Sequence, residues 1–325
     1  MKYIPTDWAT PYYNMALENM LMNDEQYDDE YVFFYIHKPS VIVGKHQNTL
    51  QEINYKFITE NDIIIARRIT GGGAVYHDNG NLNYSFVFNR RDGDTIDFEP
   101  YTRPVIKALE SLGVKSELSG RNDILIDGRK FSGTAQYMNK RKVLSHGTLM
   151  FDLNIENMVN ALNVDNLKIE SKAITSVKSR VANLVDYLSS GLDIFTFRQH
   201  LIDSFFKGMK MQTLELDSSE IEKINQSVKD KFSSWDHNYG NSPAFNTVKK
   251  KKFEAGIIEA GINVEHGIIT QIRFTGDFFV NEPIDVLERI LTGVKFEEKT
   301  IRNLKELNNI ISGITIDNLA ELLFY

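Results

Sequence analysis

Three strand patterns in close succession decide the fold, and they lie within residues 123–151, whose sequence is DILIDGRKFSGTAQYMNKRKVLSHGTLMF. β-rich segments at residues 123–127, 131–137 and 143–151 are separated by short stretches, a spacing typical of consecutive hairpins. A short turn reverses the chain and therefore joins antiparallel strands. This part of the sequence predicts a sheet that is mainly antiparallel.

The remainder of the first 245 residues supplies further strands and helices. Strand patterns also occur at residues 31–37, 41–44, 63–67 and 82–88, with turn-forming residues Lys38-Pro39-Ser40 between the first two. Helical spacing occurs at residues 11–22, 101–112, 155–162, 194–210 and 218–232. The order lacks the regular strand–helix alternation of a doubly wound sheet, so we predict an α+β fold with helices packed on the sheet.

A change in composition near residue 246 predicts a domain boundary. Residues 235–246 are rich in Gly, Asn, Ser and Pro, and four lysines follow at residues 249–252. Beyond them, strand patterns at residues 253–265 and 268–274 and helical patterns at residues 284–291 and 316–323 suffice for a small module. We predict a large domain at residues 1–245 and a small α+β accessory domain at residues 246–325.

The composition is that of a globular protein with a large core. Of 325 residues, 42% are hydrophobic and 25% are charged, and the formal net charge is −7. Proteins that bind the nucleic-acid backbone favour a basic footprint, so we expect no nucleic-acid partner. No apolar run approaches the roughly 20 residues that span a bilayer, and the N-terminus lacks a secretory signal pattern. We expect a cytoplasmic protein with no membrane partner.

The sequence contains no cysteine. This excludes disulfides, cysteine-ligated zinc, iron–sulfur clusters and thiolate nucleophiles. The seven histidines show no ligand-type pairing in sequence, which disfavours a histidine-based metal site. A hard cation such as Mg²⁺, held by nucleotide phosphates and a carboxylate such as Asp123, stays compatible with the sequence.

A glycine-rich stretch follows the predicted strand at residues 63–67. Arg67 and Arg68 precede three consecutive glycines at residues 71–73, and His77 follows. Glycines let backbone N–H groups approach and converge on an anion, and arginines are planar donors suited to phosphate or carboxylate. The alternative is a glycine-rich hairpin with solvated arginines. The stretch matches neither standard nucleotide-binding fingerprint, so a nucleotide would bind there in another way.

Two further segments carry candidate site residues. Lys130 begins a strand with small residues at Ser132, Gly133 and Ala135, which leave space beside the lysine for a ligand. A lysine ammonium can contact phosphate and carboxylate oxygens together, although a surface lysine is the simpler interpretation. His146 opens an apolar strand and is compatible either with a pocket or with a hydrogen-bonded structural role.

Taken together, these motifs resemble the lipoate–protein ligase family, whose order they follow over most of the chain. The motifs are Arg67-Arg68-x-x-Gly71-Gly72-Gly73-Ala74-Val75-Tyr76-His77-Asp78-x-Gly80-Asn81, Gly120-Arg121-Asn122-Asp123, Arg129-Lys130-x-Ser132-Gly133-x-Ala135, His146-Gly147-Thr148-Leu149, Lys172-Ala173-Ile174-Thr175-Ser176-Val177-x-Ser179-Arg180-Val181-x-Asn183-Leu184, Trp235-x-x-x-Tyr239-Gly240-x-Ser242-Pro243-x-Phe245 and Thr275-Gly276-Asp277-Phe278-Phe279.

The resemblance implies a catalytic domain related in fold to biotin protein ligases, followed by an accessory domain. It implies a ligase that converts lipoate and ATP to lipoyl-AMP and pyrophosphate, and then passes the lipoyl group to a lysine of an acceptor protein. The implied acceptors are lipoyl domains of E2 subunits of 2-oxoacid dehydrogenases and the glycine-cleavage H protein. We expect the ligase itself to be a monomer without a tightly bound prosthetic group.

The resemblance also implies roles for individual residues. Lys130 is the implied catalytic residue, in contact with both ATP and the lipoate carboxylate. The implied ATP and adenylate site consists of Arg68, Gly73, Ala74, Val75, Tyr76, Asp123 and Lys130. The implied lipoate site consists of Gly72, His77, Lys130 and His146. Lys172, Lys178 and Arg180 lie in a segment similar to the loop that covers the adenylate, and Asp123 is the implied contact of a nucleotide-borne Mg²⁺.

The sequence departs from the family pattern near the implied lipoyl site. Tyr137 stands where some members carry an arginine, and Ile69 stands where a serine can follow the arginines. The preference for lipoate or octanoate therefore stays open. The apolar lipoyl tail needs a hydrophobic tunnel, for which the strand patterns at residues 41–44 and 82–88 are candidates.

Two other functions are compatible with the same fold. One is an acyltransferase that moves octanoyl or lipoyl groups between carrier proteins without ATP; relatives of that kind use a cysteine nucleophile, which this chain lacks. The other is a catalytically silent protein that keeps the lipoate pocket and recruits lipoyl-domain proteins. The four lysines at residues 249–252 could steer an acidic acceptor, although a solvated strand edge is the simpler interpretation.

Overall fold

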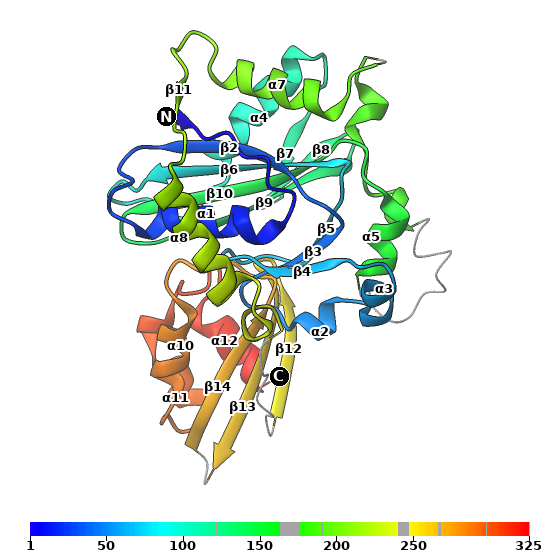
Figure 1. Ribbon diagram of the computed structural model, residues 1–325. Helices are drawn as coiled ribbons and strands as arrows, with labels where there is room; N and C mark the ends of the chain where they lie inside the picture. The colour runs from blue at the N-terminus through cyan, green and yellow to red at the C-terminus, as the bar shows by residue number, and fades with distance from the viewer. Residues whose placement is uncertain are drawn as a thin grey trace.

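The computed structural model describes residues 1–120, 122–162, 176–189, 191–239, 247–265, 268–296 and 298–324. Its largest element is an eight-stranded sheet with the order β11-β1-β2-β6-β10-β9-β8-β7 (Figure 1). The strands are β1 (Lys2–Tyr3), β2 (Tyr31–Ile36), β6 (Asn81–Asn89), β7 (Glu117–Ser119), β8 (Asp123–Ile126), β9 (Arg129–Met138), β10 (Lys142–Met150) and β11 (Gln212–Thr213). Pairs from β2 to β7 are antiparallel, while β1 runs parallel to both neighbours, which confirms the mainly antiparallel α+β fold.

Helices cover both faces of this sheet. Helix α1 (Pro11–Asn23) packs on one face, and α4 (Glu99–Ser111) and α7 (Ile194–Phe205) pack on the other. The side chains of strand β2 are therefore buried on both faces of the sheet. Val32 and Phe34 pack in the apolar cluster that includes α7. Phe33 and Tyr35 pack in the cluster that includes α1. A strand whose side chains alternate between two packed faces must be apolar along its whole length, as β2 is.

A second, three-stranded sheet lies across α1 from the first. It consists of β3 (Ser40–Val43), β4 (Ile64–Arg67) and β5 (Val75–His77) in the order β4-β3-β5. Ile42 and Ala66 of this sheet share an apolar cluster with α1 and with β2 of the large sheet. The turn predicted at Lys38-Pro39-Ser40 therefore makes no hairpin, since it carries the chain from one sheet to the other.

The C-terminal part forms an accessory unit with its own core. Strands β12 (Thr247–Phe253), β13 (Gly256–Glu265) and β14 (Ile268–Gly276) make an antiparallel sheet packed against α10 (Ile284–Leu291), α11 (Glu298–Arg302) and α12 (Ile316–Phe324) (Figure 1). The single strand predicted at residues 253–265 thus corresponds to the last residue of β12 and the whole of β13. The lysine run lies on β12, at the sheet edge. The predicted boundary after residue 245 falls outside the described residues.

The remaining elements are short. They are α2 (Thr49–Glu52), α3 (Tyr55–Glu60), α5 (Ile155–Ala161), η1 (Leu184–Tyr187), α8 (Ser218–Ser227), η2 (Val228–Phe232), α9 (Trp235–Asn238) and η3 (Lys305–Leu307). No sequence pattern predicts α2, α3 or β5, because elements of three to six residues are too short to show a period. Within the described ranges, no helix has the length and apolar character needed to span a membrane.

Gly80 fixes how the chain enters β6. Its carbonyl accepts hydrogen bonds from the amides of Phe151 and Asp152, and a Cβ atom at Gly80 would lie 1.9 Å from the Asp152 carbonyl oxygen. Because that oxygen belongs to the backbone, the strand itself would have to move.

We expect Gly80→Ala to lower the free energy of unfolding by about 3 kcal/mol, measured by urea denaturation. The control is Gly93→Ala, where nothing lies within 4 Å of the added Cβ and the cost is the strain of a positive φ, about 1–2 kcal/mol. Equal losses in the two variants would contradict the close approach at Gly80.

Candidate active site

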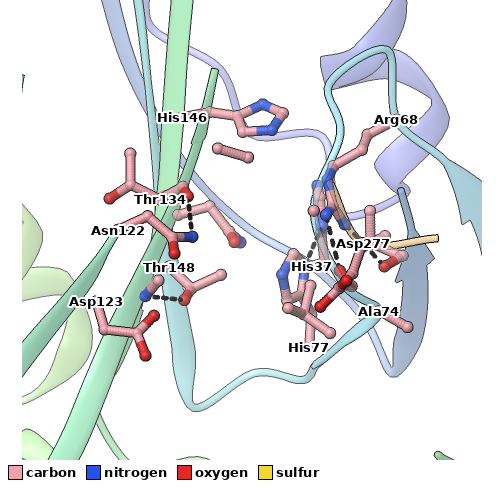
Figure 2. A pocket seen from close by; sticks show the side chains of 18 of the residues that line it. His37, Arg68, Ala74, His77, Asn122, Asp123, Thr134, His146, Thr148 and Asp277 are labelled. Atoms are coloured by element: carbon pink, nitrogen blue, oxygen red, sulfur yellow. Dashed lines mark hydrogen bonds between the residues drawn. The ribbon is translucent and has the colours of Figure 1, made fainter. Parts of the chain in front are cut away.

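A cavity of about 320 Å³ lies between the large sheet and the glycine loop, which we define as residues 68–74 between β4 and β5. Figure 2 shows its two walls: Asn122, Asp123, Thr134, His146 and Thr148 on one side face Arg68, Ala74, His77, His37 and Asp277 on the other. The remaining lining residues are Met15, Glu18, Tyr35, Ile42, Gly72, Gly73, Val75, Asn83, Lys130, Gly133, Ala135, Gly147 and Phe279.

The glycine loop is organised by the buried side chain of Arg68. Its guanidinium donates to the carbonyl oxygens of Ile42 (3.1 Å), Gly71 (2.8 Å) and Gly73 (2.7 Å), and its Nε also donates to Thr70 Oγ1 (3.0 Å). Burial lowers the pKa of Arg68 to about 10, which leaves it cationic at neutral pH. Arg68 therefore lines the cavity, but its donors hold the loop.

Arg67 does not face the cavity, and its role differs from the one predicted. Its guanidinium donates to the carbonyls of Gly44 (2.9 Å), Gln47 (2.7 Å) and His237 (3.0 Å) and to Thr49 Oγ1 (2.6 Å). These partners belong to the segment after β3 and to α9. The predicted phosphate donor is thus a cross-link between distant parts of the chain.

Two of the three glycines are required, Gly71 by close contact with the accessory unit and Gly72 by its backbone conformation. A Cβ at Gly71 would lie 2.1 Å from the Phe278 carbonyl oxygen, and Gly72 has a φ of +90° while its amide donates to that same oxygen (3.2 Å). The ring of Phe278 stacks on His46 with centroids 4.8 Å apart. The accessory unit is therefore docked on the loop, and it contributes Asp277 and Phe279 to the cavity.

Lys130 and Asp123 form an ion pair at the cavity wall opposite this loop. Lys130 Nζ lies 2.7 Å from Asp123 Oδ1, and both side chains are partly exposed, at 41% and 36%. Asp123 pairs with Gly133 across β8 and β9. The register shifts by one residue before Leu125, which pairs with Lys130 and not with Phe131. A Cβ at Gly133 would lie 3.2 Å from Lys130 Nζ, so this glycine leaves room for the ammonium.

The backbone of Lys130 is held by the described part of the segment similar to an adenylate loop. The Lys130 amide donates to the Arg180 carbonyl (2.8 Å), and the Lys130 carbonyl accepts from the Ala182 amide (2.9 Å). The side chains of Lys178 and Arg180 are exposed, and Arg180 Nε donates to the Ser176 carbonyl. Lys172 lies outside the described residues. The structure thus brings the end of this segment to Lys130.

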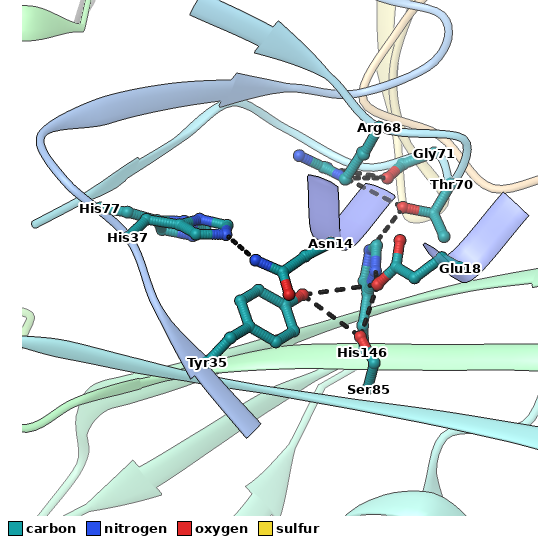
Figure 3. Close-up of polar contacts among 10 residues, drawn as sticks. All are labelled: Asn14, Glu18, Tyr35, His37, Arg68, Thr70, Gly71, His77, Ser85 and His146. Atoms are coloured by element: carbon teal, nitrogen blue, oxygen red, sulfur yellow. Dashed lines mark hydrogen bonds and ion pairs between the residues drawn. The ribbon is translucent and has the colours of Figure 1, made fainter. Parts of the chain in front are cut away.

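A directed chain of hydrogen bonds links Arg68 to His146 and the buried carboxylate of Glu18 (Figure 3). His146 Nε2 lies 2.8 Å from Thr70 Oγ1, which accepts from Arg68, and His146 Nδ1 lies 2.8 Å from Glu18 Oε1. Since a carboxylate only accepts, His146 Nδ1 donates to Glu18 Oε1. Ser85 and Tyr35 also donate to Glu18.

A pair of histidines forms another buried contact at the cavity. His37 Nδ1 and His77 Nδ1 are 3.0 Å apart, and Asn14 Nδ2 lies 3.2 Å from His37 Nε2. Burial lowers the pKa of His37 to about 3. Burial, with His37 and Arg68 beside it, lowers the pKa of His77 well below its ordinary value.

The structure places most of the predicted site residues on one cavity. Those that line it are Arg68, Gly72, Gly73, Ala74, Val75, His77, Asp123, Lys130 and His146. Tyr76 differs, because its side chain packs in the core and only its backbone follows the loop. Tyr137 and Ile69 are not among the lining residues; the Tyr137 ring lies 5.1 Å from Lys45 Nζ, and Ile69 packs against the α1 cluster.

Several cavity residues were not predicted for the site, among them Glu18, His37, Asp277 and Phe279. Glu18 and His37 lie in segments whose patterns predict only a helix and a strand, so their convergence depends on packing. Asp277 and Phe279 belong to a motif that was recognised but given no role. Of the predicted tunnel segments, residues 41–44 and 82–88 contribute Ile42 and Asn83, while Leu82, Tyr84 and Phe86 face the core.

The cavity offers a cation, an organised loop and a partly apolar interior, and no cluster of metal ligands. Across the part of the chain that the structure describes, no group of three or more His, Asp or Glu side chains could hold a metal ion. A site of this kind suits a ligand that is anionic at one end and apolar at the other.

Comparisons with known proteins agree along the whole chain. Residues 10–206 match the family model of the lipoyl protein ligase A/B catalytic domain, and residues 242–323 match that of the bacterial lipoate protein ligase C-terminus. The chain is 42% identical to a lipoate–protein ligase of Bacillus subtilis over 321 residues, 97% of each protein. It is 39% identical to lipoate–protein ligase 1 of Staphylococcus aureus over 294 residues, 90% of each.

Solved structures give the same result. The crystal structure of P. falciparum LipL1 in complex with lipoate is similar, with a TM-score of 0.82 and 25% identity, covering 98% of this chain and 97% of that one. A lipoate–protein ligase A bound with ATP has a TM-score of 0.63 and 26% identity, covering 74% of this chain and 98% of that one.

We expect Arg68→Lys to lower the free energy of unfolding by about 2–4 kcal/mol, because a compact ammonium cannot reach the Ile42, Gly71 and Gly73 carbonyls together. Urea denaturation provides the measurement. The control is Arg103→Lys, an exposed arginine of α4 paired with Glu99, which should change stability by less than about 0.5 kcal/mol. A loss at position 68 no larger than the loss at position 103 would rule out this role of Arg68.

Proposed function

Because the chain belongs to the lipoate–protein ligase family, we propose that it joins free lipoate to ATP as lipoyl-AMP and then transfers the lipoyl group to a lysine of a lipoyl-acceptor protein. The observation that carries this proposal is the position of Lys130, an ammonium at the wall of a cavity that faces the glycine loop. A cation at that point can sit between two anionic reactants.

In the first step, an oxygen of the lipoate carboxylate attacks the α-phosphorus of ATP. The new P–O bond forms as the bond from the α-phosphorus to the bridging oxygen breaks, and pyrophosphate leaves with that electron pair. Two anions must approach each other, so the barrier falls when a fixed cation and oriented N–H groups meet the developing charge. Lys130 would provide the cation, and the backbone of residues 73–76 would provide the donors.

In the second step, the neutral amine of the acceptor lysine attacks the acyl carbon of lipoyl-AMP. The C–N bond forms, the bond from the acyl carbon to the phosphate oxygen breaks, and AMP leaves. The Lys130 ammonium, lying beside the acyl phosphate group, would polarise the acyl carbonyl and stabilise the departing phosphate. The amine loses one proton to solvent or to a nearby base, which completes the amide.

Arg68 would act on the nucleotide through the loop it holds. Its donors are engaged by the Ile42, Gly71 and Gly73 carbonyls and by Thr70, so its role is to fix where the loop amides point. Loop amides that are positioned in advance need little reorganisation when charge develops on the phosphate. This supports nucleotide binding by the backbone of Gly73, Ala74, Val75 and Tyr76.

The lipoyl-AMP anhydride must be protected from water. Arg180 and Ala182 of the segment at residues 172–184 are hydrogen-bonded to the backbone of Lys130. This supports a covering role for Lys178 and Arg180 together with Lys172. A loop anchored beside the reacting groups would close over the adenylate while Lys130 keeps its position.

Mg²⁺ would reach the site with the nucleotide. A resident metal would need a cluster of ligands, and the described residues hold none, whereas a nucleotide-borne ion needs few protein contacts beyond the phosphate oxygens. Asp123 is a carboxylate on the cavity wall and fits such a contact. When bound, the ion would neutralise phosphate charge.

Lipoyl-domain proteins are the proposed partners, including E2 subunits and the glycine-cleavage H protein. A solved relative is described with its E2 lipoyl domain, which supports acceptors of this class. We further propose a cytoplasmic monomer that divides into domains after residue 245, where the composition changes. ATP-independent transfer by a cysteine has no residue to carry it in this sequence.

We expect Lys130→Ala to slow adenylation by about 10²–10³ or more, since it removes the preorganised cation. The measurement is lipoate-dependent exchange of radiolabelled pyrophosphate into ATP with Mg²⁺ and without acceptor. The control is Lys140→Ala, an exposed lysine on the turn after β9. Adenylation within a few fold of wild type in Lys130→Ala would show that Lys130 is misassigned, and no exchange by the folded wild type would refute the ligase proposal.

A second experiment tests transfer to acceptors. With lipoate and Mg-ATP, the wild-type protein should add one lipoyl group, detected by intact mass, to an E2 lipoyl domain and to H protein assayed side by side. Acceptors whose target lysine is replaced by alanine serve as controls. Adenylation without modification of either acceptor would contradict the proposed partners while leaving the first step intact.

A further inference from the structure

Arg68 ties the glycine loop to itself and to the sheet of β3, β4 and β5. The backbone carbonyls that accept from its guanidinium belong to Gly71 and Gly73 of the loop and to Ile42 of β3. Lys130, by contrast, lies at the start of β9 in the large sheet. The position of the loop relative to Lys130 therefore needs a further contact, from the loop to the large sheet.

Thr70 of the loop makes such a contact. Its Oγ1 lies 2.8 Å from Nε2 of His146, which stands on β10. Strand β10 pairs with β9, so this hydrogen bond joins the loop to the strand beside the one that carries Lys130. Thr70 is fully buried and is not among the residues that line the cavity. Its effect on a ligand is therefore indirect.

Glu18 holds the other side of the His146 ring. His146 Nδ1 donates to Glu18 Oε1 at 2.8 Å, and a hydrogen bond to a charged group is about twice as strong as one between neutral groups. Glu18 is buried on α1, and the hydroxyls of Tyr35 and Ser85 donate to the same oxygen. The ring is thus held between Thr70 and Glu18 (Figure 3).

The first chemical step makes the position of the loop relative to Lys130 important. The lipoate carboxylate and the α-phosphate must meet while Lys130 and the loop amides both contact the developing charge. A displacement of about 1 Å can slow such a reaction by about 10²-fold. Binding of ATP depends less on this position, because Arg68 keeps the loop amides in place with respect to one another.

We infer that Thr70 and Glu18 are positioning residues, which hold the His146 ring between them and so fix the glycine loop relative to Lys130 for adenylation. The inference rests on the proposed function and adds two residues to its first step. Neither residue takes part in the bond changes, since both act through His146 and the loop.

The first test measures kcat and KM in pyrophosphate exchange. Thr70→Val nearly keeps the shape of the side chain and removes the hydroxyl, while Arg68 Nε retains the Gly71 carbonyl at 3.1 Å. We expect kcat to fall by about tenfold to a hundredfold, with KM for ATP and for lipoate within about threefold of wild type. Thr70→Ser keeps the hydroxyl and should hold kcat within about threefold of wild type.

The matched control is Thr6→Val. Thr6 is another buried threonine; its hydroxyl donates to the Phe34 carbonyl, and it does not line the cavity. Loss of this hydroxyl should change kcat and both KM values by less than about twofold. An equal fall of kcat in Thr70→Val and Thr70→Ser, or a rise of KM for lipoate in place of the fall in kcat, would overturn the inference.

Glu18→Gln tests the second residue. Glutamine keeps an acceptor oxygen and puts its amide nitrogen where Oε2 is buried without a partner among the described residues, so the main loss is the negative charge. We expect kcat to fall by about threefold to tenfold, because the bond from His146 is no longer charge-assisted. In the Thr70→Val background the same change should lower kcat by less than about twofold, since the hydrogen bond to the loop is already absent. Effects that multiply in the double variant would show that Glu18 does not act through Thr70.

Hydrogen exchange of the backbone amides of residues 68–74 in the ligand-free protein separates this inference from the proposed function, because it needs no activity. Faster exchange in Thr70→Val than in Thr70→Ser supports the inference, and equal rates overturn it. If Thr70→Val does not fold, kcat and hydrogen exchange of Glu18→Gln against wild type decide in the same way. Folded wild-type protein that activates no lipoate would refute the proposed function instead.

Discussion

The guanidinium of Arg68 donates to three backbone carbonyls from two segments, and the path of the glycine loop follows from these hydrogen bonds. Because this cation is buried, its charge needs compensation, which the carbonyl dipoles and the nearby carboxylate of Glu18 provide. The loop so held faces Lys130 across the cavity, and Phe278 of the accessory unit docks on it. The position of the loop at the cavity wall and its contact with the accessory unit therefore both depend on Arg68.

Much of the fold is legible in the sequence, because long elements repeat their pattern often enough to be recognised. Helix α1 and strands β9 and β10 fall within a residue or two of their predicted limits. The sorting of strands between sheets was not predictable, since β2 and β3 have similar apolar patterns and only tertiary packing separates them. The short elements near the glycine loop, α2, α3 and β5, were not predictable because they have too few residues to show a period.

The site was predictable where chemistry is concentrated in sequence and not where packing assembles it. Lys130 with Gly133 and the glycine loop are local motifs, and all of them reach the cavity. Glu18 and His37 come from a helix and a strand whose other residues are core, so no local pattern marks them. Arg67 shows the opposite error, because an arginine beside a glycine loop resembles a phosphate ligand until its carbonyl partners are known.

The central claim is that carboxylate and α-phosphate meet at Lys130, opposite the glycine loop, with the acyl chain in the same cavity. A crystal structure with a non-hydrolysable lipoyl-adenylate analogue tests it most directly. The account predicts that the group replacing the phosphate contacts Lys130 Nζ and the backbone amides of residues 73–76, and that the acyl chain lies within the same cavity. An analogue bound with its acyl chain outside this cavity, or with its phosphate mimic away from Lys130, would contradict the account.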